Sequence, residues 1–160
     1  MDRRLKAYNG RVAAIELMGQ VEANKFIRGE VSRIATPVAD LRDTPNGRRQ
    51  RQLLHGETLK IYDEMSENFF VQADKDQYVG YVSKETITQS SIEPTHVISV
   101  PLCHAYPDPD IKSEPMLQLT MGAKVMAVKE MDGFYKTELG WISKKSASLI
   151  PTSFSDPVAV

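Results

Sequence analysis

The feature that most constrains this chain is an internal repeat. Residues 53–64 and 119–130 both begin with an apolar residue and have a glycine at the fourth position. After the glycine, apolar and polar residues alternate, and each segment ends in an acidic residue. Each copy later closes on Gly, an aromatic residue, an aliphatic residue, Ser and Lys, at residues 80–84 and 140–144. An alternation with a period of two residues is typical of a half-buried strand. The sequence therefore predicts two copies of one small unit built from short strands.

The two copies also begin alike. Residues 36–42 and 99–106 form the openings, and each opening is followed by a polar stretch rich in Pro, Asp, Asn or Gly. These residue types favour tight turns, because Gly and Asn tolerate a positive φ and Pro presets φ for the first turn position. Short strands, frequent turns and no long helical pattern favour a small barrel in each copy. The predicted fold is all-β: two tandem SH3-like barrels over residues 29–88 and 95–151.

The segments outside the barrels are less regular. In the N-terminal extension, residues 1–28, apolar side chains fall at helical spacing but are interrupted by Gly19. This pattern predicts a short helix followed by extended chain that packs on the barrels. At the other end, Ser155-Asp156-Pro157 is typical of a helix start. We therefore expect residues 152–160 to begin the linker to a further domain.

Charge and composition argue against several classes of partner. The formal net charge is −1, so no bulk field favours nucleic acid or an anionic membrane. The N-terminus has no continuous apolar run, so we expect no signal peptide, no membrane span and a cytoplasmic location. Arg48, Arg49 and Arg51 form a basic run, which is either a solvated loop face or a contact for phosphates or a carboxylate.

The residues needed for catalysis or metal binding do not occur in a recognisable arrangement. The single cysteine, Cys103, is followed directly by His104, and neighbours on a strand point to opposite faces. The two side chains therefore cannot form a thiol–base pair, and Cys103 is expected to be a buried apolar residue. His55, His96 and His104 lack the spacing of a zinc site. We expect no catalytic residue, no metal and no cofactor in this chain.

Among the aromatic residues, Tyr78 is the best candidate for a ligand contact. It follows the polar hairpin tip at residues 74–77, where a phenol can rest its ring on the barrel and expose its hydroxyl. Asp76 and Tyr81 are its sequence neighbours in this candidate site. The alternative is that Tyr78 is only a packing residue of the barrel.

Short motifs follow one another along nearly the whole chain in a specific order. They comprise residues 2–5, 7–8, 19–23, 26, 37–42, 71–73, 78–82 and 156–160. Together they resemble the N-terminal region of bacterial NlpC-type cell-wall cysteine peptidases. The resemblance is to γ-D-glutamyl–diamino acid endopeptidases, which carry two bacterial SH3 (SH3b) domains ahead of the catalytic domain.

This resemblance implies a role for the chain within a larger hydrolase. The family's catalytic Cys and His lie beyond the motif at residues 156–160, and nothing in this chain matches them. In such enzymes the first SH3 domain packs on the peptidase domain and supplies an aromatic hydroxyl to the pocket for the free amino end of the peptide. Tyr78 is the matching position. Residues 68–70 depart from the family, which often has a Trp-containing segment there.

The function predicted from the sequence is non-catalytic. The chain is expected to be the targeting or substrate-selecting region of a peptidoglycan (muropeptide) endopeptidase, with a C-terminal peptidase domain and peptidoglycan-derived peptides as its partners. The alternative is a stand-alone module that binds cell wall or protein without a peptidase. Nucleic-acid binding is disfavoured by the balanced charge.

Overall fold

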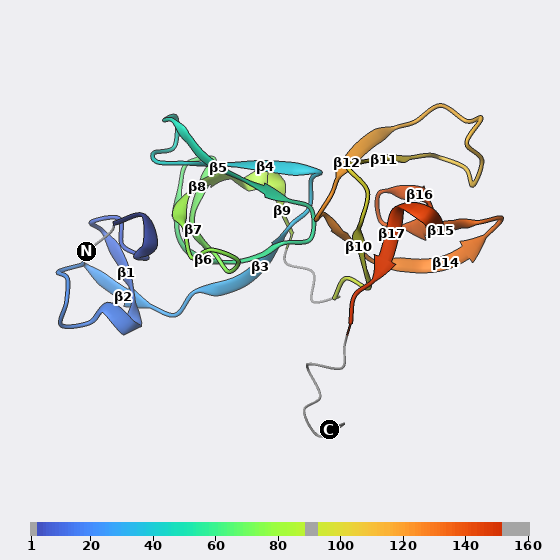
Figure 1. Cartoon of the computed structure of the whole chain (residues 1–160). Coiled ribbons are helices and arrows are strands. Elements are labelled where there is room, and N and C mark those ends of the chain that lie inside the picture. Colours follow the sequence, from blue (N-terminus) through green and yellow to red (C-terminus); the bar gives the residue numbers. More distant parts are fainter. Residues whose placement is uncertain (1–2, 89–92, 152–160) are drawn as a thin grey trace, which may run out of the picture. The chain divides into compact units, whose positions relative to one another are not determined.

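Strands dominate the structure, and the prediction of an all-β fold is confirmed. The computed structural model describes residues 3–88 and 93–151. The chain divides into a first unit, residues 1–91, and a second unit, residues 92–160 (Figure 1). No helix in the described ranges is long and apolar enough to cross a membrane.

The first unit contains a seven-stranded sheet that surrounds one hydrophobic core. Its strands are β3 (Glu30–Ile34), β4 (Val38–Arg42), β5 (Arg49–Leu54), β6 (Thr58–Met65), β7 (Asn68–Ala73), β8 (Val79–Ser83) and β9 (Ile87–Thr88). They lie in the order β5-β4-β8-β7-β6-β3-β9, and a 3-10 helix, η3 (Lys84–Thr86), precedes β9. Leu41, Leu59 and Val71 are fully buried in the core. Gly80 lets β8 approach β4, because a Cβ there would lie 2.5 Å from the carbonyl oxygen of Arg42.

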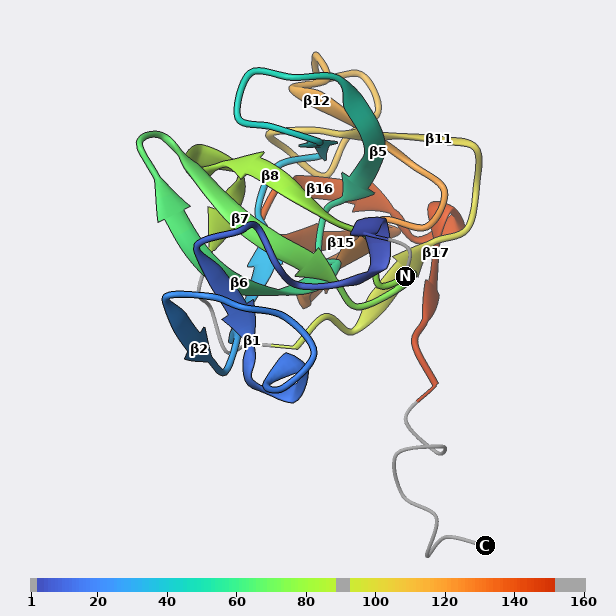
Figure 2. The same cartoon turned by 90° about the vertical axis from the view of Figure 1, so that its left-hand side faces the viewer.

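The N-terminal extension packs on the outside of this sheet. It consists of η1 (Arg3–Leu5), β1 (Val12–Ala14), η2 (Ile15–Leu17) and β2 (Lys25–Ile27), and β1 pairs with β2 in parallel. Figure 2 shows β1 and β2 beside β6. Ala13 and Leu17 are buried against a second hydrophobic cluster that includes the aromatic side chains Tyr62, Phe70 and Tyr81. The extension therefore completes the hydrophobic packing of the first unit.

The helix predicted near Gly19 is smaller than expected. The described part of the extension holds two three-residue 3-10 helices, η1 and η2, in place of an α-helix. Gly19 has φ +90°, a conformation that an α-helix cannot continue through. Leu17 is buried, while Met18 is 60% exposed. The apolar residues that suggested a helix therefore form a short turn that buries Leu17 and leaves Met18 exposed.

The second unit is also built of short strands. These are β10 (His96–Ile98), β11 (Leu102–Ala105), β12 (Leu117–Thr120), β13 (Lys124–Val125), β14 (Ala127–Met131), β15 (Phe134–Thr137), β16 (Gly140–Ser143) and β17 (Ala147–Leu149). A 3-10 helix, η4 (Lys144–Ser146), precedes β17. The succession β14-β15-β16-η4-β17 repeats that of β6-β7-β8-η3-β9 in the first unit.

Equivalent side-chain contacts recur in the two units. The ammonium group of Lys84 pairs with Glu64 and lies 5.5 Å from the ring centroid of Phe69. In the second unit, Lys144 pairs with the carboxylate of Glu130 at 3.0 Å and lies 5.6 Å from the ring centroid of Tyr135. The sequence repeat is therefore also a structural one, down to the contacts of a single lysine.

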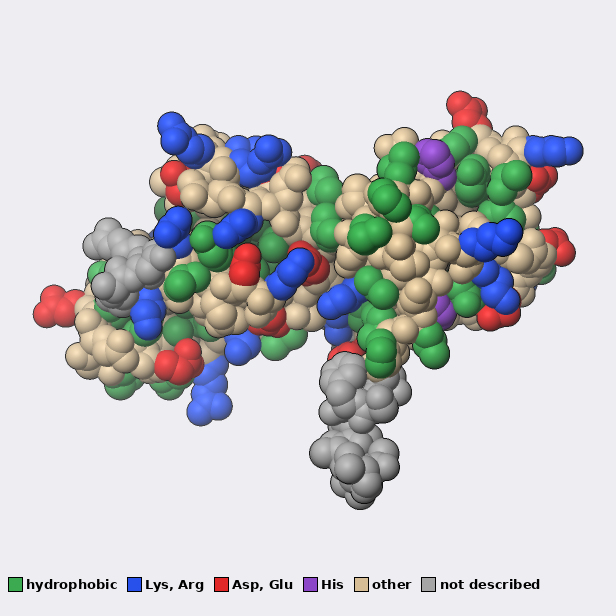
Figure 3. Space-filling model, viewed as in Figure 1, with side chains coloured by type: hydrophobic (Ala, Val, Ile, Leu, Met, Phe, Trp, Pro, Cys, Tyr) green, Lys and Arg blue, Asp and Glu red, His purple; other side chains and the backbone are tan. Residues whose placement is uncertain are grey.

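Large hydrophobic side chains remain exposed on the second unit (Figure 3). They are Leu102, Ile111, Met116, Met121, Val128, Met131 and Leu149. The tail around residues 154–160, where the sequence predicts a linker, lies outside the described residues.

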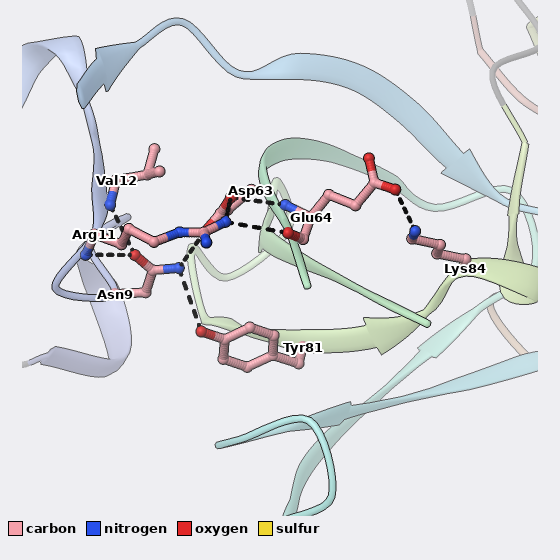
Figure 4. Close-up of polar contacts among 7 residues, drawn as sticks. All are labelled: Asn9, Arg11, Val12, Asp63, Glu64, Tyr81 and Lys84. Carbon is pink, nitrogen blue, oxygen red and sulfur yellow. Dashed lines mark hydrogen bonds and ion pairs between the residues drawn. The ribbon is translucent and has the colours of Figure 1, made fainter. Parts of the chain in front are cut away.

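A buried carboxylate joins the extension to the first unit (Figure 4). The side chain of Asp63, on β6, is only 8% exposed. Arg11 donates to its two oxygens, from Nη2 to Oδ1 at 2.6 Å and from Nε to Oδ2 at 3.1 Å. Asn9 donates from Nδ2 to Oδ2 at 2.9 Å, and also to the hydroxyl of Tyr81 at 3.3 Å. Asn9 and Arg11 of the extension therefore both bind to Asp63 of the first unit.

These contacts set the protonation state of Asp63. Burial alone raises the pKa of its carboxyl group, but the hydrogen bonds from Arg11, Asn9 and the Glu64 backbone amide outweigh this effect. The pKa of Asp63 is therefore lowered, and the folded state favours the charged carboxylate.

Replacing Asp63 with Asn is expected to destabilise the protein at pH 7. The loss should be about 1–3 kcal/mol, because hydrogen bonds to a charged, partly buried group are removed. A lowered folded-state pKa means that this stability is present above the unfolded pKa of about 3.9 and is lost as the pH falls through the folded value. Urea unfolding at pH 7 and at acid pH should show the wild type and Asp63→Asn converging at the lower pH.

The matched control is Asp74→Asn, which removes an exposed carboxylate from the same unit. It should leave the free energy of unfolding nearly unchanged at both pH values. A stability gap for Asp63→Asn that persists undiminished in acid would contradict the electrostatic account.

Candidate functional site

Tyr78 lies between the turn at residues 74–77 and the start of β8. Gln77 takes φ +65° in this turn, and the backbone N–H of Tyr78 donates to Oδ1 of Asp76 at 3.1 Å. The ring of Tyr78 is half-buried and packs against the core of the first unit. Its hydroxyl makes no hydrogen bond to any residue in the described ranges. The phenol therefore has a packed ring and a polar end that is available to a ligand.

Two arginines lie over the Tyr78 ring. The Cζ atom of Arg51, on β5, is 4.1 Å from the ring centroid, and that of Arg4, in η1, is 5.7 Å away. Arg51 also approaches Asp76, with Nε 3.7 Å from Oδ2. Stacking of this kind is favourable because the negative face of the ring attracts the cation. In Figure 3, Lys and Arg side chains gather over the β4–β5 hairpin that carries Arg51.

The structure places the predicted site residues in two different environments. Asp76 contacts Tyr78 and Arg51 directly. Tyr81 is 8% exposed and belongs to the outer cluster beneath the extension, where its ring centroid lies 5.2 Å from that of Phe70. Tyr78 and Tyr81 are three positions apart, and side chains on a strand alternate between its two faces. The two tyrosines therefore point to opposite faces. The structure thus brings Asp76 to Tyr78, while Tyr81 contributes to a different surface.

That different surface is a pocket that the sequence analysis missed. Its volume is about 610 Å³, and the residues that line it come from both the extension and the barrel. The lining includes Arg4, Tyr8, Asn9, Pro45, Phe70 and Tyr81. A second hollow of about 440 Å³ shares Pro45 and Tyr81, but most of its other lining residues are polar, among them Asp40, Arg42 and Asn68. Only the folding of residues 4–9 onto the barrel creates the larger pocket, so no local motif indicates it.

Cys103 and His104 lie in different surroundings on β11. Cys103 is 2% exposed, and burial raises the pKa of its thiol, which favours the neutral form. His104 is half-buried, and its Nε2 lies 3.2 Å from Nε2 of Gln118. A buried neutral thiol is a poor nucleophile. Within residues 3–88 and 93–151, no group of three or more His, Cys, Asp or Glu residues is arranged to hold a metal ion.

Solved structures that are similar to this chain include the following three. A crystal structure of an NlpC/P60 family protein from Bacillus cereus ATCC 10987 matches 75% of this chain and 56% of its own, with 14% identity and a TM-score of 0.58. NlpC2 from Trichomonas vaginalis matches 75% of this chain and 48% of its own, with 17% identity and a TM-score of 0.35. NlpC1 from the same organism matches 92% of this chain and 50% of its own, with 14% identity and a TM-score of 0.36. This chain therefore spans about half the length of these proteins.

The sequence comparison identifies one segment. No curated protein matches the chain. Residues 41–87, from β4 to the start of β9, match the family model described as the bacterial dipeptidyl-peptidase Sh3 domain. This segment includes Arg51, Asp76 and Tyr78, and strands β5 to β8 of the first unit's sheet lie within it. Residues 41–87 are therefore similar in sequence to a bacterial SH3 domain, in a chain whose fold is similar to that of an NlpC/P60 family protein.

Proposed function

We propose that this chain is the non-catalytic SH3b region of a bacterial peptidoglycan (muropeptide) endopeptidase. In this role it packs on a peptidase domain and helps to recognise the free amino end of cell-wall peptides. The observation that carries the proposal is the match of residues 41–87 to the SH3 domain of bacterial dipeptidyl-peptidases. The likeness to the Bacillus cereus NlpC/P60 family structure, which is longer than this chain, agrees with a peptidase partner.

Tyr78 is the residue proposed to contact the peptide. Its ring is held by the barrel core and its hydroxyl makes no bond to the described residues, so the oxygen can accept a hydrogen bond from an ammonium group. One phenolic oxygen satisfies only part of an ammonium group, which has three donors. A carboxylate from the peptidase domain would have to supply the rest.

The proposal predicts that the chain alone does not hydrolyse its peptide. Incubation with L-Ala-γ-D-Glu-diaminopimelate, followed by chromatography of the products, should show no cleavage because Cys103 is buried and its pKa is raised. Cys103→Ala should behave like the wild type. Turnover that Cys103→Ala abolishes would overturn the non-catalytic assignment.

The peptidase partner can be tested directly in the gene. The reading frame that follows the codon for Val160 should encode an NlpC/P60-type peptidase domain. A stop codon there, with no such domain encoded beside it, would favour a stand-alone binding module.

Tyr78→Phe tests recognition of the amino end in the protein that carries the peptidase domain. The change should lower kcat/KM for the free tripeptide by the equivalent of about 0.5–1.5 kcal/mol, the net contribution of one hydrogen bond. The N-acetylated tripeptide should be unaffected because it has no ammonium group. Tyr135→Phe, which removes a hydroxyl from the second unit, is the control. Equal losses on free and acetylated substrates would contradict the role of Tyr78 in amine recognition.

A further inference from the structure

The two barrels differ in what covers the outer face of one hairpin. In the first unit this hairpin is β6–β7, and the N-terminal extension packs on it. In the second unit the equivalent hairpin is β14–β15 (Figure 1). The strand pairing agrees, because each hairpin has a register shift at the same position of the repeat, between Ile61 and Asp63 and between Ala127 and Lys129. The residues of the two hairpins can therefore be compared one by one.

Positions that the extension covers in the first unit are exposed in the second. Tyr62 is 4% exposed beneath the extension, whereas Val128, at the equivalent position, is 59% exposed. Met65 packs against the same buried cluster, whereas its equivalent, Met131, is 41% exposed. Among residues 93–151, no segment takes the place of the extension on this hairpin. The outer face of β14–β15 is therefore an uncovered copy of a face that the first unit covers.

The charge of this face is also reversed. Asp63 of the first unit accepts hydrogen bonds from the extension, and its equivalent in the second unit is Lys129. The position of the buried Phe70 is taken by Lys136, whose ammonium group lies 5.9 Å from the ring centroid of Trp141. Both lysines are exposed, and neither forms an ion pair with an acidic residue in the described ranges. The face therefore carries two cations whose charge no described residue neutralises.

The two lysines are also cross-strand neighbours. Lys129 on β14 lies directly opposite Lys136 on β15. Like charges at directly opposed positions destabilise a sheet, so folding alone does not explain this pair. At the corresponding pair in the first unit, Asp63 opposite Phe70, the extension supplies the opposite charge through Arg11. A covering segment with carboxylates would satisfy the two lysines in the same way and offset their repulsion.

The side chains around the lysines indicate which kind of anion fits. Val128 and Met131 are apolar and exposed on the same hairpin, and a surface of apolar and charged side chains matches a polypeptide better than a polyanion without apolar groups. The extension of a second copy is a poor match, because residues 3–27 hold five Lys and Arg against two Glu. The favoured occupant is an acidic segment of another protein.

We infer that Val128, Lys129, Met131 and Lys136 form a docking surface for an acidic, partly apolar polypeptide segment of a partner protein. The carboxylates of this segment bind the two lysines, and its apolar side chains cover Val128 and Met131. The surface belongs to the second unit, so the inference is independent of the role proposed for Tyr78 in the first.

An NMR titration of the whole chain tests the surface with two matched peptides. The acidic probe is Ac-Glu-Val-Asp-Leu-Glu-NH2, and the neutral probe is Ac-Gln-Val-Asn-Leu-Gln-NH2. The acidic probe should shift the backbone amide signals of Val128 and Lys136 at millimolar concentration. At low salt its affinity should exceed that of the neutral probe by about tenfold or more, and added salt should reduce the difference. Equal affinities, or no shift at these two signals with either probe, would overturn the surface.

Two single variants assign the preference to the hairpin. Lys129→Gln should abolish the preference for the acidic probe, and its own spectrum reports whether it is folded. Lys112→Gln removes the same charge from an exposed lysine of the second unit that lies outside the hairpin, so it should keep the preference. An equal loss in both variants would show a diffuse charge effect and contradict a defined site.

A charge reversal separates binding from folding. Lys129→Glu places an acid opposite Lys136, so it should raise the urea midpoint of the second unit while it abolishes binding of the acidic probe. The fluorescence of Trp141, the single tryptophan of the chain, reports unfolding of this unit. A midpoint equal to or below that of the wild type would show that the lysine pair serves the fold, and would overturn the argument from repulsion.

Three further outcomes would assign the face to a different occupant and overturn the inference. The first is a single-stranded oligonucleotide that binds as tightly as the acidic peptide at the same salt concentration. The second is a shift of the Val128 signal with protein concentration alone, which would show that a second copy binds there. The third is a difference at this signal between the whole chain and a chain that ends at residue 151, which would assign the face to residues 152–160.

Discussion

The pairing of β7 with β8 is the interaction on which the first unit depends. Val71 and Val82 face the barrel core, while Phe70 and Tyr81 face the outer cluster beneath the extension. The register Phe70↔Tyr81 places both outward aromatic rings side by side. These two strands are therefore buried on both faces, and a shift by one residue would exchange the two clusters. The barrel, the attachment of the extension and the position of Tyr78 at the start of β8 all follow from this register.

The repeat separates structural contacts from candidate functional ones within a single chain. A lysine that begins a 3-10 helix, a glutamate on β6 or β14 and an aromatic ring occur together in both units. The buried Asp63 network and the arginine stack occur around the first barrel. Asp63 has a structural explanation, because it holds the extension in place.

The sequence by itself determined the repeat and the all-β class. Strand alternation and turn residues are local patterns, so they can be recognised without any information on contacts between distant residues. It also placed Asp76 next to Tyr78, since both belong to one turn. Tertiary structure decided what local patterns cannot encode. Gly19 reduced the expected helix to a short turn, and Tyr81 went to the opposite face from Tyr78. Arg4 reached the ring of Tyr78, which is remote from it in sequence, and the extension and the barrel together made the pocket. Such contacts arise only when segments far apart in the sequence share one surface.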